Sequence, residues 1–238
     1  MDEVSVALCT FNGERFLAEQ LRSILEQTRP AVQLVIADDG STDGTLAVAD
    51  ATIAEYRASH PDRTPAVVVL TGDKPLGVAA NFERALRACT GDLIALSDQD
   101  DVWEPERLER MVAALDAIPD AGLLHSDARL IDGSGSDLGT TLFAALGITD
   151  AERRAIDEGR GYDALLRRNL ATGATTMVRA SVRDRALPVP DGWIHDEWLA
   201  IVAAVTGRTA ILGETLTRYR QHGTNQIGAR KPTLGDKI

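Results

Sequence analysis

Along the first half of the chain, short apolar runs alternate with longer segments in which apolar residues recur every three or four positions. The short runs suit buried strands, and the longer spacing suits helices with one buried face. The expected strands are Val4–Cys9, Val32–Ala37, Ala66–Leu70 and Leu93–Leu96. The expected helices are Glu14–Gln27, Thr42–Arg57, Val78–Cys89 and Glu104–Ile118. Repeated strand–helix units of this kind predict a Rossmann-like α/β fold with a mostly parallel sheet and helices on both faces.

The second half of the chain is less regular. After the apolar run Leu123–Ser126, the alternation fades into a segment rich in Gly and Ser, Asp132–Gly139. Further helical or strand-like segments follow at Asp150–Glu158, Tyr162–Arg168, Ala174–Val178, Trp198–Val205 and Thr209–Leu212. Because no Pro-rich linker or internal repeat separates the halves, we predict one domain over residues 1–228 with a C-terminal elaboration. Residues 229–238 are expected to form a flexible tail.

Composition and charge exclude several classes of protein. With 238 residues, 44% of them hydrophobic, the chain can bury a full core and is not disordered. The formal net charge of -11, without any run of Lys or Arg, argues against nucleic acid as a partner. The N-terminus lacks the pattern of a signal peptide, and the longest apolar stretch, Leu199–Val205, is too short to span a bilayer. We expect a cytoplasmic protein and leave open a peripheral contact with the inner face of a membrane.

Absent motifs exclude other classes. Cys9 and Cys89 are the two cysteines, and without a Cys-x-x-Cys pair they are expected to be buried core residues. The chain has neither a P-loop nor a dinucleotide-binding glycine motif. A sugar-phosphate nucleotidyltransferase should have a glycine-rich loop after the first strand, where only Gly13 occurs. In the phosphatase-like triplet Asp43-Gly44-Thr45, the nucleophile position is Ser41 rather than Asp.

Polar side chains follow three of the expected strands. The segments are Thr10-Phe11-Asn12-Gly13, Asp38-Asp39-Gly40-Ser41-Thr42-Asp43 and Ser97-Asp98-Gln99-Asp100-Asp101-Val102-Trp103. The carboxyl ends of parallel strands meet at one edge of a sheet, where ligands of such folds bind. The aspartates of the last segment would repel one another unless a cation lies between them, a solvated turn being the simpler alternative. In the second segment, the side chains could bind sugar or base groups or cap the next helix.

Taken in order, these segments resemble the GT-A fold glycosyltransferases of family 2, especially the bacterial rhamnosyltransferase branch. The resemblance runs from residue 4 to about residue 228 and includes three further motifs. They are Gly77-Val78 with Asn81-Phe82, His195-Asp196-Glu197-Trp198, and Tyr219-Arg220-Gln221-His222-Gly223-Thr224-Asn225. The resemblance implies a GT-A domain with a nucleotide-sugar-binding half, 1–103, and an acceptor half, 104–228.

The resemblance further implies an enzyme that transfers a sugar from a nucleoside diphosphate to an acceptor hydroxyl with inversion at the anomeric carbon. The branch favours dTDP-rhamnose as the donor, with a UDP-hexose as the alternative, and a surface polysaccharide or lipid-linked glycan as the acceptor. A sugar-nucleotide-binding relative that has lost catalysis is the non-enzymatic alternative. Donor-binding residues carried over from the family are Thr10, Phe11, Asn12, Glu14, Asp39, Ser41, Asn81, Asp98 and Gln99.

By the same resemblance, Asp100 is the expected ligand of a divalent cation, Mn²⁺ or Mg²⁺. Such a cation, held by carboxylates, stabilises the charge that develops on the diphosphate leaving group. His222 is either a second ligand or a plain loop histidine, and an imidazole ligand suits Mn²⁺ better.

Asp196 is the expected general base, because an acceptor hydroxyl is a poor nucleophile until its proton is removed. Glu197 departs from the branch, which commonly has an aromatic residue there, and is the alternative base. Both carboxylates could instead only complement a helix N-terminus. The candidates for acceptor binding are Gly173, in the loop Asn169–Thr175, and Trp193, Glu197 and Trp198, although a core position would also explain Trp198.

Overall fold

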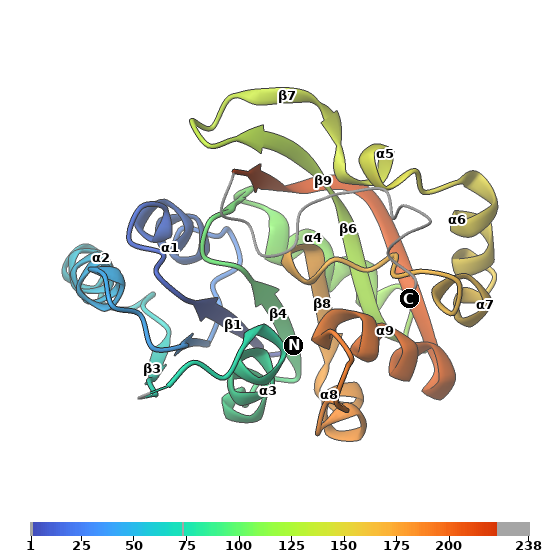
Figure 1. Ribbon diagram of the computed structural model, residues 1–238, viewed down its shortest axis with the longest axis horizontal. Helices are drawn as coiled ribbons and strands as arrows, with labels where there is room; N and C mark the ends of the chain where they lie inside the picture. Colours follow the sequence, from blue (N-terminus) through green and yellow to red (C-terminus); the bar gives the residue numbers. More distant parts are fainter. Residues whose placement is uncertain (1, 73, 223–238) are drawn as a thin grey trace.

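The computed structural model describes residues 2–72 and 74–222 and contains a nine-stranded sheet with helices on both faces (Figure 1). The strand order is β3-β2-β1-β4-β8-β6-β9-β5, and β7 pairs with β6. The predicted class of fold, an α/β sheet flanked by helices, is therefore confirmed. The predicted flexible tail, 229–238, and the end of the predicted domain, 223–228, lie outside the described residues.

Four parallel strands form one half of the sheet, in the order β3-β2-β1-β4. They are β1 (Val4–Thr10), β2 (Gln33–Asp38), β3 (Ala66–Leu70) and β4 (Leu93–Ser97). All four were predicted from the apolar runs of the sequence. The helices between them are α1 (Leu17–Leu25), α2 (Thr45–Ser59) and α3 (Val78–Ala88). This connectivity places the polar segments after β1, β2 and β4 at one edge of the sheet.

Helices α1 and α2 begin later than the sequence predicts, because the loops in front of them hold each other. Glu14 Oε2 accepts a hydrogen bond from Gly44 N at 2.9 Å, which ties the loop after β1 to the loop after β2. Asp43 Oδ1 then accepts a hydrogen bond from the first N–H of α2, at Thr45, at 3.0 Å. Asp43 therefore caps the start of α2. Ser41 and Thr42, the other two residues that could have capped this helix, do not bind its first N–H groups.

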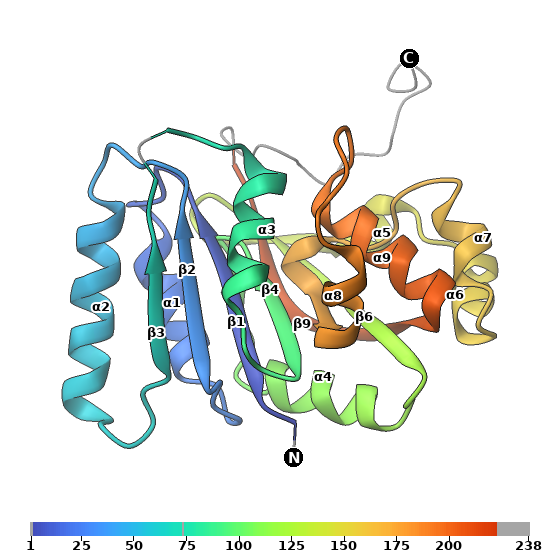
Figure 2. The same ribbon diagram turned by 90° about the horizontal axis from the view of Figure 1, so that it is seen from below.

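Of the parallel strands, β1, β2 and β4 are buried on both faces, which explains their continuous apolar runs, whereas β3 is partly exposed. In β1, Val6 and Leu8 pack in the same cluster as side chains of α1, α2 and α4 (Arg107–Asp116). Ala7 and Cys9 pack in the opposite cluster, with side chains of α3, α8 (Ala180–Ala186) and α9 (His195–Thr206). Figure 2 shows α3 and α8 on the near side of the strands and α1 on the far side. Cys9 and Cys89 are buried free thiols, as predicted.

The other half of the sheet is mixed, so a mostly parallel arrangement holds only for β3 to β4. Its strands are β5 (Val102–Trp103), β6 (Ala121–Asp132), β7 (Asp137–Thr141), β8 (Thr176–Arg179) and β9 (Arg208–Gln221). Strand β8 lies antiparallel between β4 and β6, and β6 is parallel to β9. The Gly and Ser segment of the sequence is the turn of the β6–β7 hairpin, where Asp132 Oδ1 accepts from Ser134 N and Ser136 N.

Strand β9 is much longer than the predicted Thr209–Leu212, and its end reaches the carboxyl edge of the parallel strands. The sequence concealed this because polar residues of β9, Thr217 and Arg220, are buried there.

The remaining elements are α5 (Leu142–Leu146), α6 (Asp150–Asp157), α7 (Gly161–Leu165) and a 3-10 turn, Gly173–Thr175. In the described part of the chain, no helix has the length and apolar character needed to cross a membrane.

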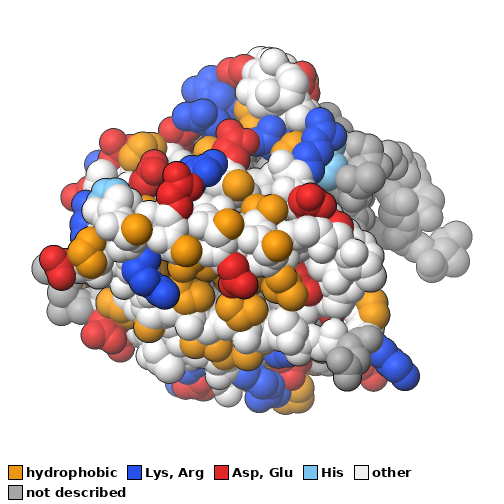
Figure 3. Space-filling model, turned by 90° about the vertical axis from the view of Figure 1, so that its left-hand side faces the viewer, with side chains coloured by type: hydrophobic (Ala, Val, Ile, Leu, Met, Phe, Trp, Pro, Cys, Tyr) orange, Lys and Arg blue, Asp and Glu red, His pale blue; other side chains and the backbone are white. Residues whose placement is uncertain are grey.

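Strand β3 is an edge of the sheet within the described residues. The face of the molecule that carries α2 and β3 shows hydrophobic side chains in its middle, among charged ones (Figure 3). Val69 of β3 is 42% exposed there. This side chain is not among those that line the cavity described next.

Candidate active site

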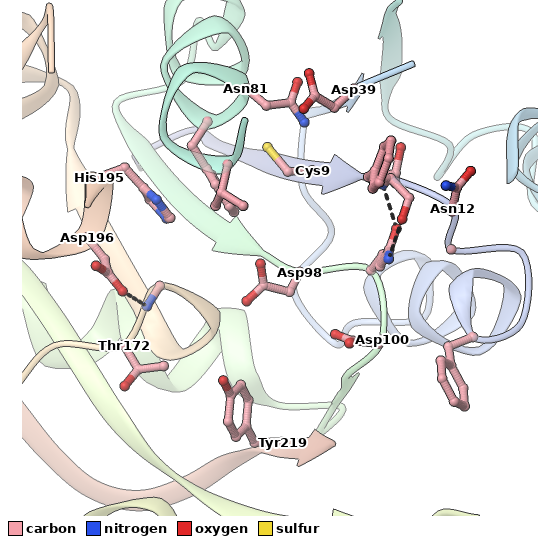
Figure 4. Close-up of a pocket in the computed structure, with 18 of the residues that line it drawn as sticks. Cys9, Asn12, Asp39, Asn81, Asp98, Asp100, Thr172, His195, Asp196 and Tyr219 are labelled. Carbon is pink, nitrogen blue, oxygen red and sulfur yellow. Dashed lines mark hydrogen bonds between the residues drawn. The ribbon is translucent and has the colours of Figure 1, made fainter. Parts of the chain in front are cut away.

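A cavity of about 610 Å³ opens where β1 and β4 end, beside α3, the start of α9 and the end of β9 (Figure 4). Its position is the carboxyl edge of the parallel strands, where ligands of such sheets bind. Its volume is in the range of small-molecule sites, about 300–1,000 Å³. The predicted site residues in its lining are Thr10, Phe11, Asn12, Asp39, Asn81, Asp98, Gln99, Asp100, Gly173, Asp196 and His222.

The aspartates after β4 separate into two environments. Asp98 and Asp100 line the cavity, whereas Asp101 lies behind it and is 1% exposed. Burial, together with the nearby carboxylates of Asp100 and Asp196, raises the pKa of Asp98 to about 7. Asp101 Oδ1 accepts from Arg220 N at 2.9 Å, and burial raises the pKa of Asp101 well above its usual range. Asp98 and Asp100 are therefore exposed to a ligand in the cavity, whereas Asp101 holds the end of β9.

Arg107, which sequence reasoning missed, is a fully buried cation beneath this cluster. Its Nη1 donates to Thr217 Oγ1 at 3.0 Å, and its guanidinium lies 3.9 Å from the centre of the Trp103 ring. Burial lowers the pKa of Arg107, and the charges of Asp101 and Asp98 only partly oppose this, so that the pKa is about 9. Arg107 is thus the buried counter-charge of the aspartates. The sequence does not distinguish Arg107 from other arginines, because α4, which begins at Arg107, also has exposed charged residues.

Asp100 and His222 approach each other across the cavity wall. His222 Nε2 lies 2.7 Å from Asp100 Oδ2, although His222 directly follows β9 and Asp100 lies in the segment after β4. Both side chains are mostly buried, at 13% exposed for His222 and 14% for Asp100. The ring of Phe16 lies 4.9 Å from the ring of His222 and covers it. The carboxylate and the imidazole therefore form one pair at the cavity.

Asp196 is held at the opposite wall by three N–H donors. Its Oδ2 accepts from Gly173 N at 2.8 Å, and its Oδ1 accepts from Glu197 N at 2.7 Å and from Asn169 Nδ2 at 3.2 Å. The side chain belongs to the first turn of α9, where a carboxylate complements the helix dipole. These bonds fix the carboxylate in one orientation, and Figure 4 shows Asp196 at the cavity.

Three of the predicted donor-binding residues also brace the cavity. Asp39 accepts from Leu76 N at 2.7 Å and Gly77 N at 2.9 Å and so holds the loop before α3. Asn81 Nδ2 donates to Ala37 O at 2.8 Å. Gln99 is hydrogen-bonded to both backbone groups of Phe11. Their side chains shape the loops around the cavity and leave part of their surface in its lining.

The other predicted residues lie outside the lining. Glu14 binds the loop before α2, and Ser41 Oγ donates to Asp38 Oδ1 at 2.6 Å. Trp193 and Trp198 pack against each other, with 5.3 Å between their rings, and Trp198 Nε1 donates to Ala186 O. Trp198 therefore packs in the apolar cluster on this face of the sheet. The structure brings neither the two tryptophans nor Glu197 to the cavity wall.

Other lining residues were not assigned a role from the sequence. They include Cys9, Arg15, Phe82, Thr172, His195 and Tyr219. Phe82, His195 and Tyr219 belong to motifs that carried the family resemblance, so the signal was present but gave no role. Arg15 and Thr172 carry no such signal, because their positions depend on how distant segments pack.

The fold is that of the GT-A glycosyltransferases. The mannosyltransferase PcManGT of Pyrobaculum calidifontis, solved with GDP-Man and Mn²⁺, aligns with a TM-score of 0.67 at 20% identity. The alignment covers 94% of this chain and 58% of that one, and at this identity it shows the fold alone. The sequence model of the family glycosyl transferase family 2 matches residues 5–143 of this chain, and the chain belongs to that family.

Two curated relatives are similar to this chain. An uncharacterized glycosyltransferase of Nostoc sp. is 27% identical in an alignment of 239 positions that covers 94% of this chain and 66% of the relative. The dTDP-rhamnosyl transferase RfbG of Shigella flexneri is 32% identical over 111 residues, 45% of this chain and 36% of the relative. The chain therefore spans less than two thirds of the length of either relative.

Proposed function

We propose that this chain is the transferase domain of an inverting glycosyltransferase that moves a sugar from a nucleoside diphosphate to a glycan hydroxyl. The observation that carries the proposal is that Asp98 and Asp100, after β4, and Asp196, on α9, face one cavity (Figure 4). Such a transfer needs carboxylates near the diphosphate and a separate base for the acceptor hydroxyl. Membership in glycosyl transferase family 2 supports the same conclusion.

In this proposal the cavity has a donor side, from residues 1–103, and an acceptor side, from residues 104–228. The loop of Thr10, Phe11 and Asn12 holds the nucleoside with Asp39, and Asp98 faces the ribose or the donor sugar. Asp196 takes the proton from the acceptor hydroxyl as that oxygen attacks the anomeric carbon. The bond from the anomeric carbon to the diphosphate breaks, and the nucleoside diphosphate leaves from the opposite face of the sugar.

Asp100 and His222 are the residues we propose for a divalent cation, and their chemistry fits one that arrives with the donor. Within the described residues, no group of three or more His, Cys, Asp or Glu side chains is arranged to hold an ion. Two protein ligands are nevertheless sufficient when diphosphate oxygens and water complete the coordination. A nitrogen beside an oxygen ligand favours Mn²⁺ over Mg²⁺. When bound, such an ion stabilises the negative charge on the departing diphosphate.

For the donor, dTDP-rhamnose is our first choice and a UDP-hexose the second. The similarity to a dTDP-rhamnosyl transferase, over 45% of this chain, supports the first choice. Thymine and uracil differ by one methyl group, and discrimination at a methylene-sized contact is worth only about 1–3 kcal/mol. The base pocket is therefore a weak guide to the donor. A surface polysaccharide or its lipid-linked precursor is the proposed acceptor.

Calorimetric titration with a panel of nucleotide sugars tests the proposal. The panel contains dTDP-rhamnose, UDP-glucose and GDP-mannose, each with Mn²⁺, with Mg²⁺ and with a chelator. Metal-dependent binding of one donor, followed by sugar transfer that fails in Asp196→Asn, would support the proposed function. Binding of a donor without any turnover would instead identify a relative that has lost catalysis. Binding of none of these donors would overturn the proposal.

A further inference from the structure

His195, which lies beside the proposed base, is a buried polar side chain without a hydrogen-bond partner in the part of the chain that the structure describes. It is the first residue of α9, is 4% exposed and lines the cavity. Neither ring nitrogen has a hydrogen-bond partner among the described residues. Figure 4 shows the ring pointing toward the interior of the cavity, on the same wall as Asp196. A buried donor and acceptor without partners cost free energy, so their retention at a cavity wall indicates a ligand.

The surroundings of His195 fix the plane of its ring at the edge of the cavity, and both ring nitrogens are buried there. Phe82 stacks on the ring with 3.8 Å between centroids and an angle of 12°. Gly173 lies against the edge of the ring, where an added Cβ would be 3.0 Å from Nε2 and 3.6 Å from Asp196 Oδ2. A side chain at position 173 would therefore crowd both the imidazole and the carboxylate. Phe82 and Gly173 thus hold the imidazole rigidly without using its polar atoms.

The protonation state of the ring defines the chemistry it can recognise. Burial lowers the pKa of His195, and the charge of Asp196 only partly opposes this. The neutral ring has one N–H donor and one acceptor nitrogen. A sugar hydroxyl both donates and accepts, and so matches either nitrogen. A phosphate group would offer the acceptor nitrogen no donor, and a metal ion would be expected to have further ligands nearby.

We propose that His195 hydrogen-bonds a hydroxyl of a sugar ring in this cavity and so distinguishes a glycosylated ligand from the bare nucleotide. This inference rests on the proposed function, because that function puts a sugar in the cavity. The hydroxyl belongs either to the donor sugar or to the acceptor sugar, and the shared chemistry is a pyranose hydroxyl beside Phe82. His195 is thus a specificity-determining residue at the boundary between the donor and acceptor sides.

Affinities of His195→Phe for paired ligands test this inference. Phenylalanine keeps a flat ring against Phe82 but removes both nitrogens. The control is His125→Phe. Like His195, His125 is buried, contacts an aromatic ring and has a ring nitrogen, Nδ1, without a hydrogen-bond partner within the described residues. Unlike His195, it does not line the cavity. The ligands are dTDP against dTDP-rhamnose and UDP against UDP-glucose, followed by methyl glycosides added to the protein saturated with nucleotide.

If His195 binds the donor sugar, His195→Phe weakens the nucleotide sugar about 5- to 10-fold, the size of one net hydrogen bond, but leaves the nucleotide unchanged. If it binds the acceptor sugar, the loss is confined to the methyl glycosides. In either case His195→Gln, which keeps a donor and an acceptor, recovers part of the affinity. Unchanged affinities for all these ligands, or equal losses for nucleotide and nucleotide sugar, would overturn the inference.

A measurement on the unaltered protein covers the case in which the variants do not fold. The sequence has four histidines, so the imidazole ¹⁵N signals can be assigned individually. We expect the His195 signal to shift when a nucleotide sugar or a methyl glycoside is added, and to stay in place with the nucleotide alone. If sugar-containing ligands bind and the His195 signal does not shift, the proposed role of His195 is refuted and the proposed function still stands. Failure of the unaltered protein to bind any nucleotide sugar would instead refute the proposed function.

Discussion

Gln99 binds the backbone of Phe11 as a neighbouring strand would. Its Oε1 accepts from Phe11 N at 2.8 Å, and its Nε2 donates to Phe11 O at 3.0 Å. Gly13 must lack a side chain here, because an added Cβ would clash with Gln99 Oε1. The amide therefore links the loop after β1 to the loop after β4, and these two loops form the proposed nucleotide side of the cavity.

Loss of this link should weaken nucleotide binding more than it weakens the fold. We expect Gln99→Ala to lower the affinity for a nucleoside diphosphate about 5- to 10-fold, since one to two net hydrogen bonds disappear from a partly exposed site. Gln99→Glu should be worse, because a carboxylate cannot donate to Phe11 O and adds charge beside Asp98 and Asp100. Calorimetry measures both affinities, and the melting temperature serves as the control for folding. Wild-type affinity in both variants would show that the loop keeps its shape without Gln99.

Asp196→Asn tests the assignment of the general base. The amide keeps the size of the side chain but cannot take a proton, so we expect sugar transfer to fall by about 10²–10⁴ while donor affinity stays within a few fold. Asp163→Asn, at an exposed position of α7, is the matched control and should transfer sugar at the normal rate. Transfer that survives in Asp196→Asn but collapses in Glu197→Gln would move the base to Glu197.

Asp100→Ala and His222→Ala should affect the same property, because the two side chains lie 2.7 Å apart. We expect Asp100→Ala to abolish the dependence of donor binding on a divalent cation. His222→Ala should weaken donor binding in Mn²⁺ more than in Mg²⁺, since imidazole suits the softer ion better. Titration at matched cation concentrations measures both effects. Metal-dependent binding at normal affinity in Asp100→Ala would remove this residue from the proposed cation site.

The sequence predicts best those parts of the fold that depend on local pattern. The parallel strands and their helices were found because apolar runs and helical spacing are local, and the polar strand ends then predicted the cavity edge. Strand β7 was missed because it is exposed and lacks an apolar run. The polar end of β9 was missed because its pairing with β6 joins residues that are distant in the sequence. Glu14 and Ser41 follow the family motif, yet they accept hydrogen bonds from Gly44 N and Asn12 N that join the loops after β1 and β2, which spacing along the chain cannot show. Arg107 was missed for a related reason, since burial of a polar side chain leaves no local signal, whereas His195 lies in a family motif that gave it no role.

Arg107 should be more important for stability than any exposed arginine of the same helix. Removal of one member of a buried charge cluster typically costs about 3–5 kcal/mol, so we expect Arg107→Met to destabilise the protein by an amount of this order. Arg107→Lys keeps the charge but loses the flat stack on Trp103 and should be intermediate. Arg110→Met is the control, because Arg110 is half exposed and its ion pair with Glu214 should contribute no more than about 1 kcal/mol. Denaturant unfolding of the three variants measures these differences. Equal stabilities of Arg107→Met and Arg110→Met would show that the aspartates do not need the buried cation.

The pair of Glu152 and Arg168 should make stability depend on pH in the acid range. Arg168 Nη2 donates to Glu152 Oε2 at 2.8 Å, and this bond, with those from Thr149, lowers the pKa of Glu152 from 4.5 to about 2. Because the folded protein binds this proton less readily than the unfolded chain, the pair stabilises the fold above pH 4.5. The contribution is lost as the pH falls through the range from about 4.5 to 2.

Glu152→Gln should therefore lower the free energy of unfolding at pH 7 by about 1.5–3 kcal/mol, the usual size of hydrogen bonds to a charged group. The difference from the unaltered protein should shrink steadily below pH 4.5 and become small near pH 2, where about half of the folded molecules and nearly all of the unfolded chains carry the proton. Glu158→Gln is the control, because its ion pair with Arg160 is more than half exposed and should contribute little at any pH. Since Arg168 precedes Asn169, which donates to Asp196 Oδ1, the same acid range should also loosen the loop beside the proposed base. A difference between Glu152→Gln and the unaltered protein that stays constant from pH 7 to pH 2 would contradict the assignment of this acid dependence to Glu152.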